Sequence, residues 1–105
     1  MNILLACNGG ISTSLIADKI MDAAKERGMN DVKAWAVDDG AIAEELEKNK
    51  VDVVLLGPQI RFKLKKIQNS FADKNIPIDC MNPMDYGMND GKKILNFAIK
   101  KIQGE

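Results

Sequence analysis

The residues best suited to carry chemistry lie at the end of the first apolar run of the chain. Cys7 closes that run, the pair Gly9 and Gly10 follows, and a helical pattern begins shortly afterwards. Two glycines let the backbone turn with several N–H groups pointing inward, because neither carries a Cβ that restricts φ. The start of a helix adds unpaired N–H groups and the positive end of the helix dipole, a field that favours thiolate over thiol. The sequence therefore predicts a cradle for a tetrahedral anion with a cysteine at its mouth.

The predicted cradle extends over the residues that follow the cysteine. Hydroxyl side chains at its far end supply donors to a bound phosphoryl group in addition to the backbone amides. We take Cys7 as the candidate nucleophile and the following residues as candidate phosphate-binding residues: Asn8, Gly9, Gly10, Ile11, Ser12, Thr13 and Ser14. The alternative is that the turn only connects two elements and that Cys7 packs as a small hydrophobic residue. The hydroxyl residues favour the interpretation that Cys7 reacts with a bound phosphoryl group.

Apolar periodicity predicts four strand–helix units. Runs that are apolar on both faces, typical of parallel strands, cover 2–7, 32–37, 51–57 and 76–81. The first helix is predicted to start near Ser12 or Thr13, the second to be capped within 38–40, and the third to open at Pro58. The last follows a turn-rich loop over 82–91. This alternation predicts an α/β fold with a four-stranded parallel open sheet of order 2-1-3-4 and helices on both faces.

Apolar residues that recur at helical spacing are expected to face the core of this fold. They are Ile16, Ile20, Ala23, Ala24, Ile42, Ala43, Leu46, Ile60, Leu64, Ile67, Phe71, Ile94, Leu95, Ala98 and Ile102.

The strand order reverses between the first and third strands, and ligands of such sheets bind at that point, beyond the carboxyl ends of the strands. This places Gly57, Pro58 and Gln59, which follow the third strand, beside the cysteine loop. Tyr86 lies in the last long loop at the same edge. These residues are candidates to flank the site. The alternative for 57–59 is that this segment only connects the third strand to the helix that follows it.

Composition excludes several classes of protein. The 105 residues, 46% of them apolar, predict a single domain over 1–105. Fifteen acidic and fifteen basic residues cancel, so no net field attracts nucleic acid or anionic lipid. No apolar run approaches the roughly 20 residues that span a bilayer, and no leader pattern is present. We expect a cytoplasmic domain that binds no nucleic acid and does not insert into the membrane.

Histidine and cysteine usage narrows the chemistry further. The chain has no histidine, which excludes a Cys-His or Ser-His dyad within it. No CxxC spacing suggests a metal, and we expect neither a metal nor a cofactor. In the predicted sheet Cys7 and Cys80 lie two strand spacings apart, roughly 9.5 Å, beyond the roughly 7 Å Cα limit for a disulfide. We therefore expect two free thiols, with Cys80 packed in the core.

Three reactions fit a cysteine in an anion cradle: phosphate-ester hydrolysis, arsenate or disulfide reduction, and temporary storage of a phosphoryl group. A cysteine phosphatase requires an arginine in the loop and an acid for the leaving group, yet no arginine occurs between Cys7 and Arg27. A reductase requires a resolving cysteine, and Cys80 is predicted to be too remote. A phosphoryl carrier, which needs no general acid, fits best.

Three segments together resemble a known family. They are Cys7-Asn-Gly-Gly-Ile-Ser-Thr-Ser-Leu15, Asp52-Val-Val-Leu-Leu-Gly-Pro-Gln-Ile60, and Tyr86-Gly87 with Asp90-Gly91 before the last helix. The combination is similar to the IIB component of the bacterial sugar phosphotransferase system (PTS), of the lactose/cellobiose type that also handles chitobiose, and it covers essentially the whole chain. This chain has Asn8-Gly9-Gly10 after the cysteine, whereas serine or alanine is frequent near the cysteine in that family. We expect this difference to tune the loop without changing its role.

The resemblance implies a phosphotransferase. In the family, the cysteine that corresponds to Cys7 takes a phosphoryl group from a histidine of the IIA component. It passes the group to a disaccharide of the cellobiose, chitobiose or lactose class held by the IIC membrane permease. The implied fold resembles low-molecular-weight tyrosine phosphatases without their loop arginine. We expect a monomer on its own that reaches the inner face of the membrane only through IIC.

Two alternatives stay open from the sequence. One is a cysteine-dependent phosphatase of the low-molecular-weight type, which would hydrolyse p-nitrophenyl phosphate. The other is a non-catalytic module that binds a phosphorylated ligand, which would tolerate loss of the Cys7 thiol.

Overall fold

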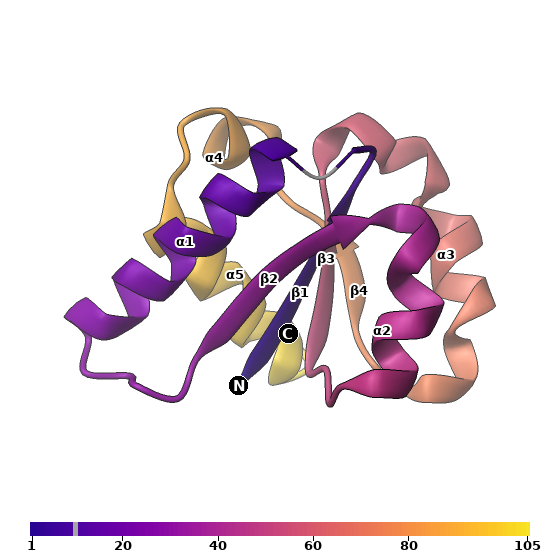
Figure 1. The fold of residues 1–105 in the computed structure, drawn as a ribbon, viewed down its shortest axis with the longest axis horizontal. Coiled ribbons are helices and arrows are strands. Elements are labelled where there is room, and N and C mark those ends of the chain that lie inside the picture. Colours follow the sequence, from indigo (N-terminus) through magenta and orange to yellow (C-terminus); the bar gives the residue numbers. More distant parts are fainter. Residues whose placement is uncertain (10) are drawn as a thin grey trace.

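Strands and helices alternate along the chain, as Figure 1 shows. The computed structural model describes residues 1–9 and 11–105. Its elements in chain order, including three short 3₁₀ segments labelled η, are β1 (Asn2–Cys7), α1 (Ile11–Glu26), β2 (Lys33–Asp38), η1 (Asp39–Ala41), α2 (Ile42–Lys48), β3 (Val53–Leu56), η2 (Pro58–Lys63), α3 (Leu64–Ser70), η3 (Ala72–Lys74), β4 (Ile78–Cys80), α4 (Pro83–Gly87) and α5 (Gly91–Ile102).

The four strands form one parallel sheet in the order β2-β1-β3-β4. This confirms the predicted fold class and strand order. β1 lies between β2 and β3, with Leu4 opposite Trp35 on one side and Val54 on the other. At the carboxyl ends of the strands, the chain runs from β1 into α1 and from β3 into η2. The loops that follow these two adjacent strands therefore flank a common site.

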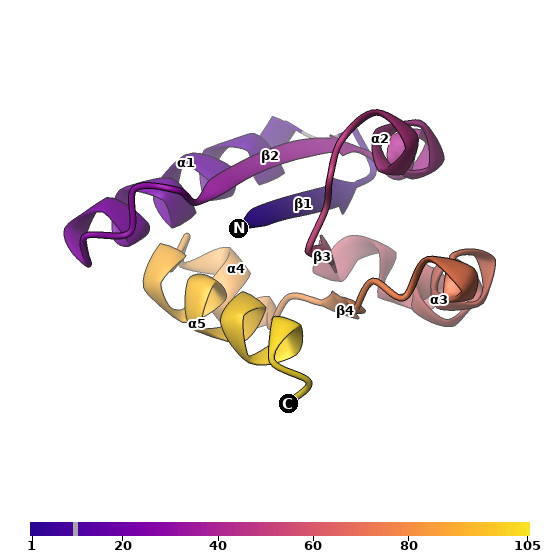
Figure 2. The ribbon, with the colours of Figure 1, turned by 90° about the horizontal axis from the view of Figure 1, so that it is seen from below.

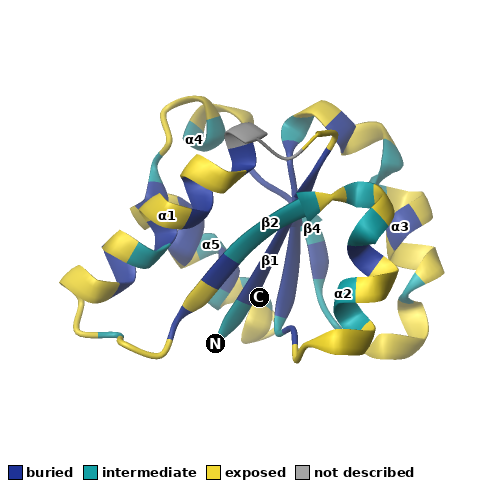
Figure 3. Cartoon of the chain, viewed as in Figure 1, coloured by how far each residue is buried: buried dark blue, intermediate teal, exposed yellow. Residues whose placement is uncertain are grey.

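Alternate residues of the strands pack against helices on opposite faces of the sheet. Ile3 and Leu5 belong to the core cluster that includes residues of α1 and α5. Leu4 and Ala6 belong to the cluster that includes residues of α2, η2 and α3. Figure 2 shows these two groups of helices, and Figure 3 shows the buried strands β1 and β3 between them. Burial on both faces explains why β1 is apolar from Ile3 to Cys7 rather than alternating. Within the described residues, no helix has the length and apolar character needed to cross a membrane.

Several boundaries differ from the predicted ones. α1 begins at Ile11 rather than at Ser12 or Thr13, and Pro58 opens a 3₁₀ segment before α3. Ala43 and Ile102, predicted to face the core, are exposed. α2 is only seven residues long and buries Ile42 alone, whereas Ile102 is the last residue of α5. A helical stripe therefore predicts burial only as far as the helix stays in contact with the sheet.

The segment 82–91, predicted as a turn-rich loop, contains the short helix α4. The Asn82 side chain accepts hydrogen bonds from the Met84 and Asp85 N–H groups, and Pro83 occupies the first helical position. A capping Asn followed by Pro is a recognised start signal, but five residues are too few to show helical periodicity. α4 carries Tyr86.

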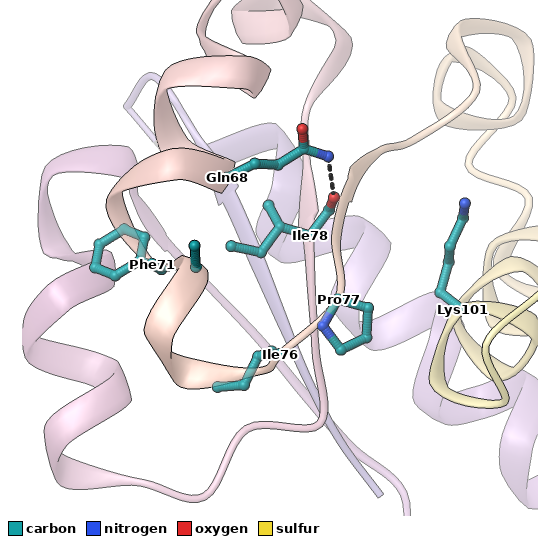
Figure 4. A pocket seen from close by; sticks show the side chains of 7 residues that line it. Gln68, Phe71, Ile76, Pro77, Ile78 and Lys101 are labelled. Carbon is teal, nitrogen blue, oxygen red and sulfur yellow. Dashed lines mark hydrogen bonds between the residues drawn. The ribbon is translucent and has the colours of Figure 1, made fainter.

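The free edge of β4 is covered by side chains. Gln68 Nε2 donates to the Ile78 carbonyl oxygen at 2.7 Å, and Lys101 forms an ion pair with Asp79, also at 2.7 Å. Figure 4 shows Gln68 and Lys101 on the wall of a cavity of about 330 Å³, together with Phe71 and Pro77. The Gln68 hydrogen bond occupies a backbone acceptor of β4 that would otherwise be free to pair with another strand. Cys7 and the described loop residues Asn8 and Gly9 do not line this cavity.

Gly91, the first residue of α5, lies against the backbone of α1. A Cβ atom at position 91 would clash with the carbonyl oxygen and carbonyl carbon of Lys19. Both atoms belong to a helix backbone and cannot rotate away. Glycine is therefore required here for space.

We expect Gly91→Ala to lower the free energy of unfolding by about 1–3 kcal/mol, because the added methyl group forces α1 and α5 apart. Urea denaturation followed by circular dichroism measures this. Gly87→Ala is the matched control, since a Cβ there meets no atom within 4 Å. Equal stability of the two variants would contradict the packing argument.

Candidate active site around Cys7

Cys7 is the last residue of β1 and lies at the carboxyl edge of the sheet, where the strand order reverses. Its exposed fraction is only 2%. The thiol donates a hydrogen bond to Gln59 Oε1, with 3.4 Å between Sγ and the oxygen. Gln59 itself is exposed. The sequence predicted a cysteine at the mouth of the loop, whereas the structure places the sulfur beneath a surface carboxamide that can rotate away.

Gly57 lies against the same sulfur. Its N–H donates to the Ala6 carbonyl oxygen at 2.8 Å, which extends the pairing of β1 with β3 by one bond. A Cβ at position 57 would lie 2.7 Å from Cys7 Sγ and 2.8 Å from Gln59 Oε1. The φ of Gly57 is −64°, which any residue adopts, so the requirement for glycine is one of space and not of conformation.

Gln59 connects the sulfur to α4. Its Nε2 donates to the Tyr86 hydroxyl oxygen at 3.2 Å while its Oε1 accepts from Cys7. Pro58 opens η2 between Gly57 and Gln59 and fixes the backbone there. The structure thus brings together Cys7, Gly57, Gln59 and Tyr86, residues that the predicted strand order placed at one edge.

The described loop residues differ in their environments. Asn8 and Gly9 are exposed, and Gly9 has φ +89°, a left-handed conformation that favours glycine. Ser14, in the first turn of α1, is exposed. Three of the candidate calls lie outside what the structure describes: Gly10 entirely, and the side chains of Ile11 and Ser12.

Thr13 is buried, unlike Asn8, Gly9 and Ser14, the other candidate phosphate-binding residues whose burial the structure describes. It is fully buried on the face of α1 that carries Ile16, Ala17 and Ile20. Among the described residues, its Oγ1 is the buried side-chain oxygen without a hydrogen-bond partner. A buried hydroxyl left unpaired costs free energy, so Thr13 sits in a place where an additional acceptor would stabilise the protein.

A carboxylate that the sequence analysis did not assign to the site lies next to the loop. Asp38 is the register partner of Cys7 in the β1–β2 pair. Its Oδ1 accepts from the Gly9 N–H at 3.1 Å and its Oδ2 from the Gly40 N–H at 2.9 Å. The hydrogen bonds from Gly9 and Gly40, assisted by the Lys63 charge, lower the pKa of Asp38 below its usual value. The sequence analysis identified Asp38 only as a helix cap. Its contact with the loop after Cys7 could have been inferred from its position at the end of the strand that pairs with β1.

Both cysteines are free thiols, so the prediction that they do not pair is confirmed. Burial raises the pKa of the Cys80 thiol, with the Arg61 charge partly opposing this effect. Cys80 belongs to the core cluster that includes Ile67 and Ile78, as expected of a packing residue.

The fold and the site define a class: a parallel α/β protein with a cysteine thiol at the switch point of a 2-1-3-4 sheet. Comparison with known proteins gives the family. The model of the family described as PTS system, lactose/cellobiose-specific IIB subunit, matches residues 2–97, and the chain belongs to this family of phosphotransferase components.

Individual relatives agree with this assignment. The chain is 38% identical over 97 residues to the oligo-beta-mannoside-specific EIIB component of Bacillus subtilis, covering 92% of this chain and 91% of the relative. It is 38% identical over 99 residues to the galactose-specific EIIB component of Lactococcus lactis subsp. cremoris, covering 91% of each. Among solved structures, the cellobiose-specific IIB component of Borrelia burgdorferi superposes with a TM-score of 0.79 at 38% identity, covering 99% of this chain and 93% of that one.

We expect Gln59→Ala to raise the rate at which iodoacetamide alkylates Cys7 several-fold, because the carboxamide that covers the sulfur is removed. Peptide mapping separates this reaction from alkylation of Cys80. Gln103→Ala, an exposed glutamine at the end of α5, serves as the control. If Cys7 reacts at the wild-type rate in Gln59→Ala, the carboxamide does not limit access to the sulfur.

Proposed function

We propose that Cys7 carries a phosphoryl group between two other components of the phosphotransferase system. The Cys7 thiolate attacks the phosphorus of a phosphohistidine on the IIA component; the S–P bond forms, and the histidine nitrogen leaves with the electron pair of the N–P bond. In the second step a hydroxyl of a sugar bound by the IIC permease gives up its proton and attacks the same phosphorus through its oxygen. The S–P bond then breaks and the thiolate is restored.

The observation that carries this proposal is the position of Cys7 at the sheet's switch point, next to the loop that leads into α1. A phosphoryl group on Sγ brings up to about two negative charges to a helix N-terminus, which favours anions. The unpaired Thr13 hydroxyl in the first turn of α1 offers one more donor. These groups are neutral, so they can hold the phosphoryl group without binding it as strongly as an arginine would.

Retention of the phosphoryl group requires that water be kept away from it. The sulfur is covered by Gln59, which also donates a hydrogen bond to the Tyr86 hydroxyl. The loop also lacks the arginine that a cysteine phosphatase needs, since none occurs between Cys7 and Arg27. We therefore infer a carrier rather than a hydrolase, with the catalytic role on Cys7 and phosphate contacts from residues 8–14.

The sugar class is inferred from the names of the relatives. They are described as specific for oligo-beta-mannoside and galactose, and the structural neighbour as specific for cellobiose. We propose a disaccharide of the cellobiose, chitobiose or lactose class, chosen by IIC and not by this chain. Residues 1–105 would act as one cytoplasmic domain, monomeric on its own, that meets the membrane through IIC.

We expect the wild-type chain to gain the mass of one phosphate after incubation with phosphoenolpyruvate, the general phosphotransferase proteins and a lactose-type IIA. Cys7→Ser should gain none, because the serine hydroxyl is a far weaker nucleophile at neutral pH than a thiolate. Intact-mass spectrometry measures both.

Cys80→Ser is the control and should be phosphorylated like the wild type. Phosphate on Cys7→Ser, or loss of phosphorylation in Cys80→Ser with Cys7 intact, would contradict the assignment. Rapid hydrolysis of p-nitrophenyl phosphate by the wild type would instead favour the phosphatase reading.

A further inference from the structure

The carboxylate of Asp38 occupies a backbone donor of the loop that follows Cys7. Its Oδ1 accepts from Gly9 N–H at 3.1 Å while its Oδ2 caps η1 through Gly40 N–H at 2.9 Å. Asp38 and Cys7 are register partners on adjacent parallel strands, so the carboxylate leaves the sheet at the same edge as the sulfur. An anionic oxygen therefore already binds one amide of the loop.

A backbone N–H that binds a carboxylate oxygen also suits a phosphoryl oxygen, because both are anionic acceptors of similar geometry. One N–H group cannot satisfy both at full strength. A phosphoryl group on Cys7 would then compete with Asp38 for the Gly9 amide. It would also place a second negative charge close to the carboxylate.

Among the described residues, no basic side chain forms an ion pair with Asp38. Lys63 forms its ion pair with Asp39, at 2.8 Å from Nζ to Oδ2. Within the part of the chain that the structure describes, the Asp38 carboxylate accepts hydrogen bonds from the backbone N–H groups of Gly9 and Gly40. Its charge is therefore available to repel a phosphoryl group on Cys7.

We propose that Asp38 is a positioning residue for phosphoryl transfer: it holds the Gly9 amide while Cys7 is unmodified, yields that amide to the phosphoryl group, and by its charge disfavours retention of the group. This inference rests on the proposed function of Cys7. It assigns to Asp38 the task of keeping the phosphoryl group transferable, so that the carrier passes the group on instead of trapping it.

The substitution that separates this role from helix capping is Asp38→Ser. Serine is a good N-cap and can still accept from Gly40 N–H, but it is shorter than Asp and uncharged, so the contact with Gly9 is lost. Asp39→Ser is the matched control, because it removes a neighbouring carboxylate that binds Lys63 and not the loop.

The test measures how phosphate distributes between IIA and this chain at equilibrium. Each variant is mixed with partly phosphorylated lactose-type IIA, and intact masses give the phosphorylated fraction of both proteins. We expect Asp38→Ser to raise the equilibrium constant for phosphorylation of Cys7 by roughly threefold or more at low salt. The increase should shrink at high salt, where surface charges are screened. Asp39→Ser should remain closer to the wild type.

An equilibrium constant in Asp38→Ser equal to or below that of the wild type would overturn the proposal, as would equal shifts in the two variants. If circular dichroism shows that Asp38→Ser is not folded, Asp38→Asn takes its place, with an increase again expected. Failure of the proposed function looks different, because the wild type itself would then take up no phosphate on Cys7.

Discussion

The structure depends on the parallel pairing of β1 with a strand on each side. That pairing brings the ends of three strands to one edge: Cys7 lies opposite Asp38 of β2, and Ala6 lies opposite Leu56 of β3. The next backbone bond, from Gly57 N–H to the Ala6 carbonyl, presses the loop after β3 against the sulfur. The chemical environment of Cys7 is therefore set by main-chain hydrogen bonds of the sheet. Few side chains of the loop itself are needed to define that environment.

Three kinds of group lie on the sulfur or on the segments next to it as a result. An exposed carboxamide, Gln59, covers the sulfur and is hydrogen-bonded to Tyr86 of α4. A neutral hydroxyl, Thr13, is buried without a partner at the start of α1. A carboxylate, Asp38, holds the loop backbone at Gly9. Covering groups, neutral donors and a repelling charge suit a phosphoryl group that must be protected for a time and then released, which is what a carrier requires and a phosphatase does not.

The sequence predicted the sheet well because its signals are strong: four apolar runs, each followed by a helical pattern, fit few topologies. The grouping of Gly57, Gln59 and Tyr86 with Cys7 followed from the strand order alone. The missed features depend on shorter or less periodic signals. α4 is too short to show a period, and Ala43 lies on a helix too short to bury its whole stripe. Asp38 resembles an ordinary helix cap until the register places it opposite Cys7, and no pattern along the chain encodes that register.

The central claim is that backbone amides next to Cys7 hold the phosphoryl group. The most direct measurement compares ¹H–¹⁵N spectra of the uniformly labelled protein before and after phosphorylation. We predict that the largest amide shifts fall within residues 7–14, in the downfield direction expected of N–H groups that donate to an anion, while the amides of α3 and β4 change little. Unchanged amides in 7–14, or maximal shifts in α3 or β4, would contradict it.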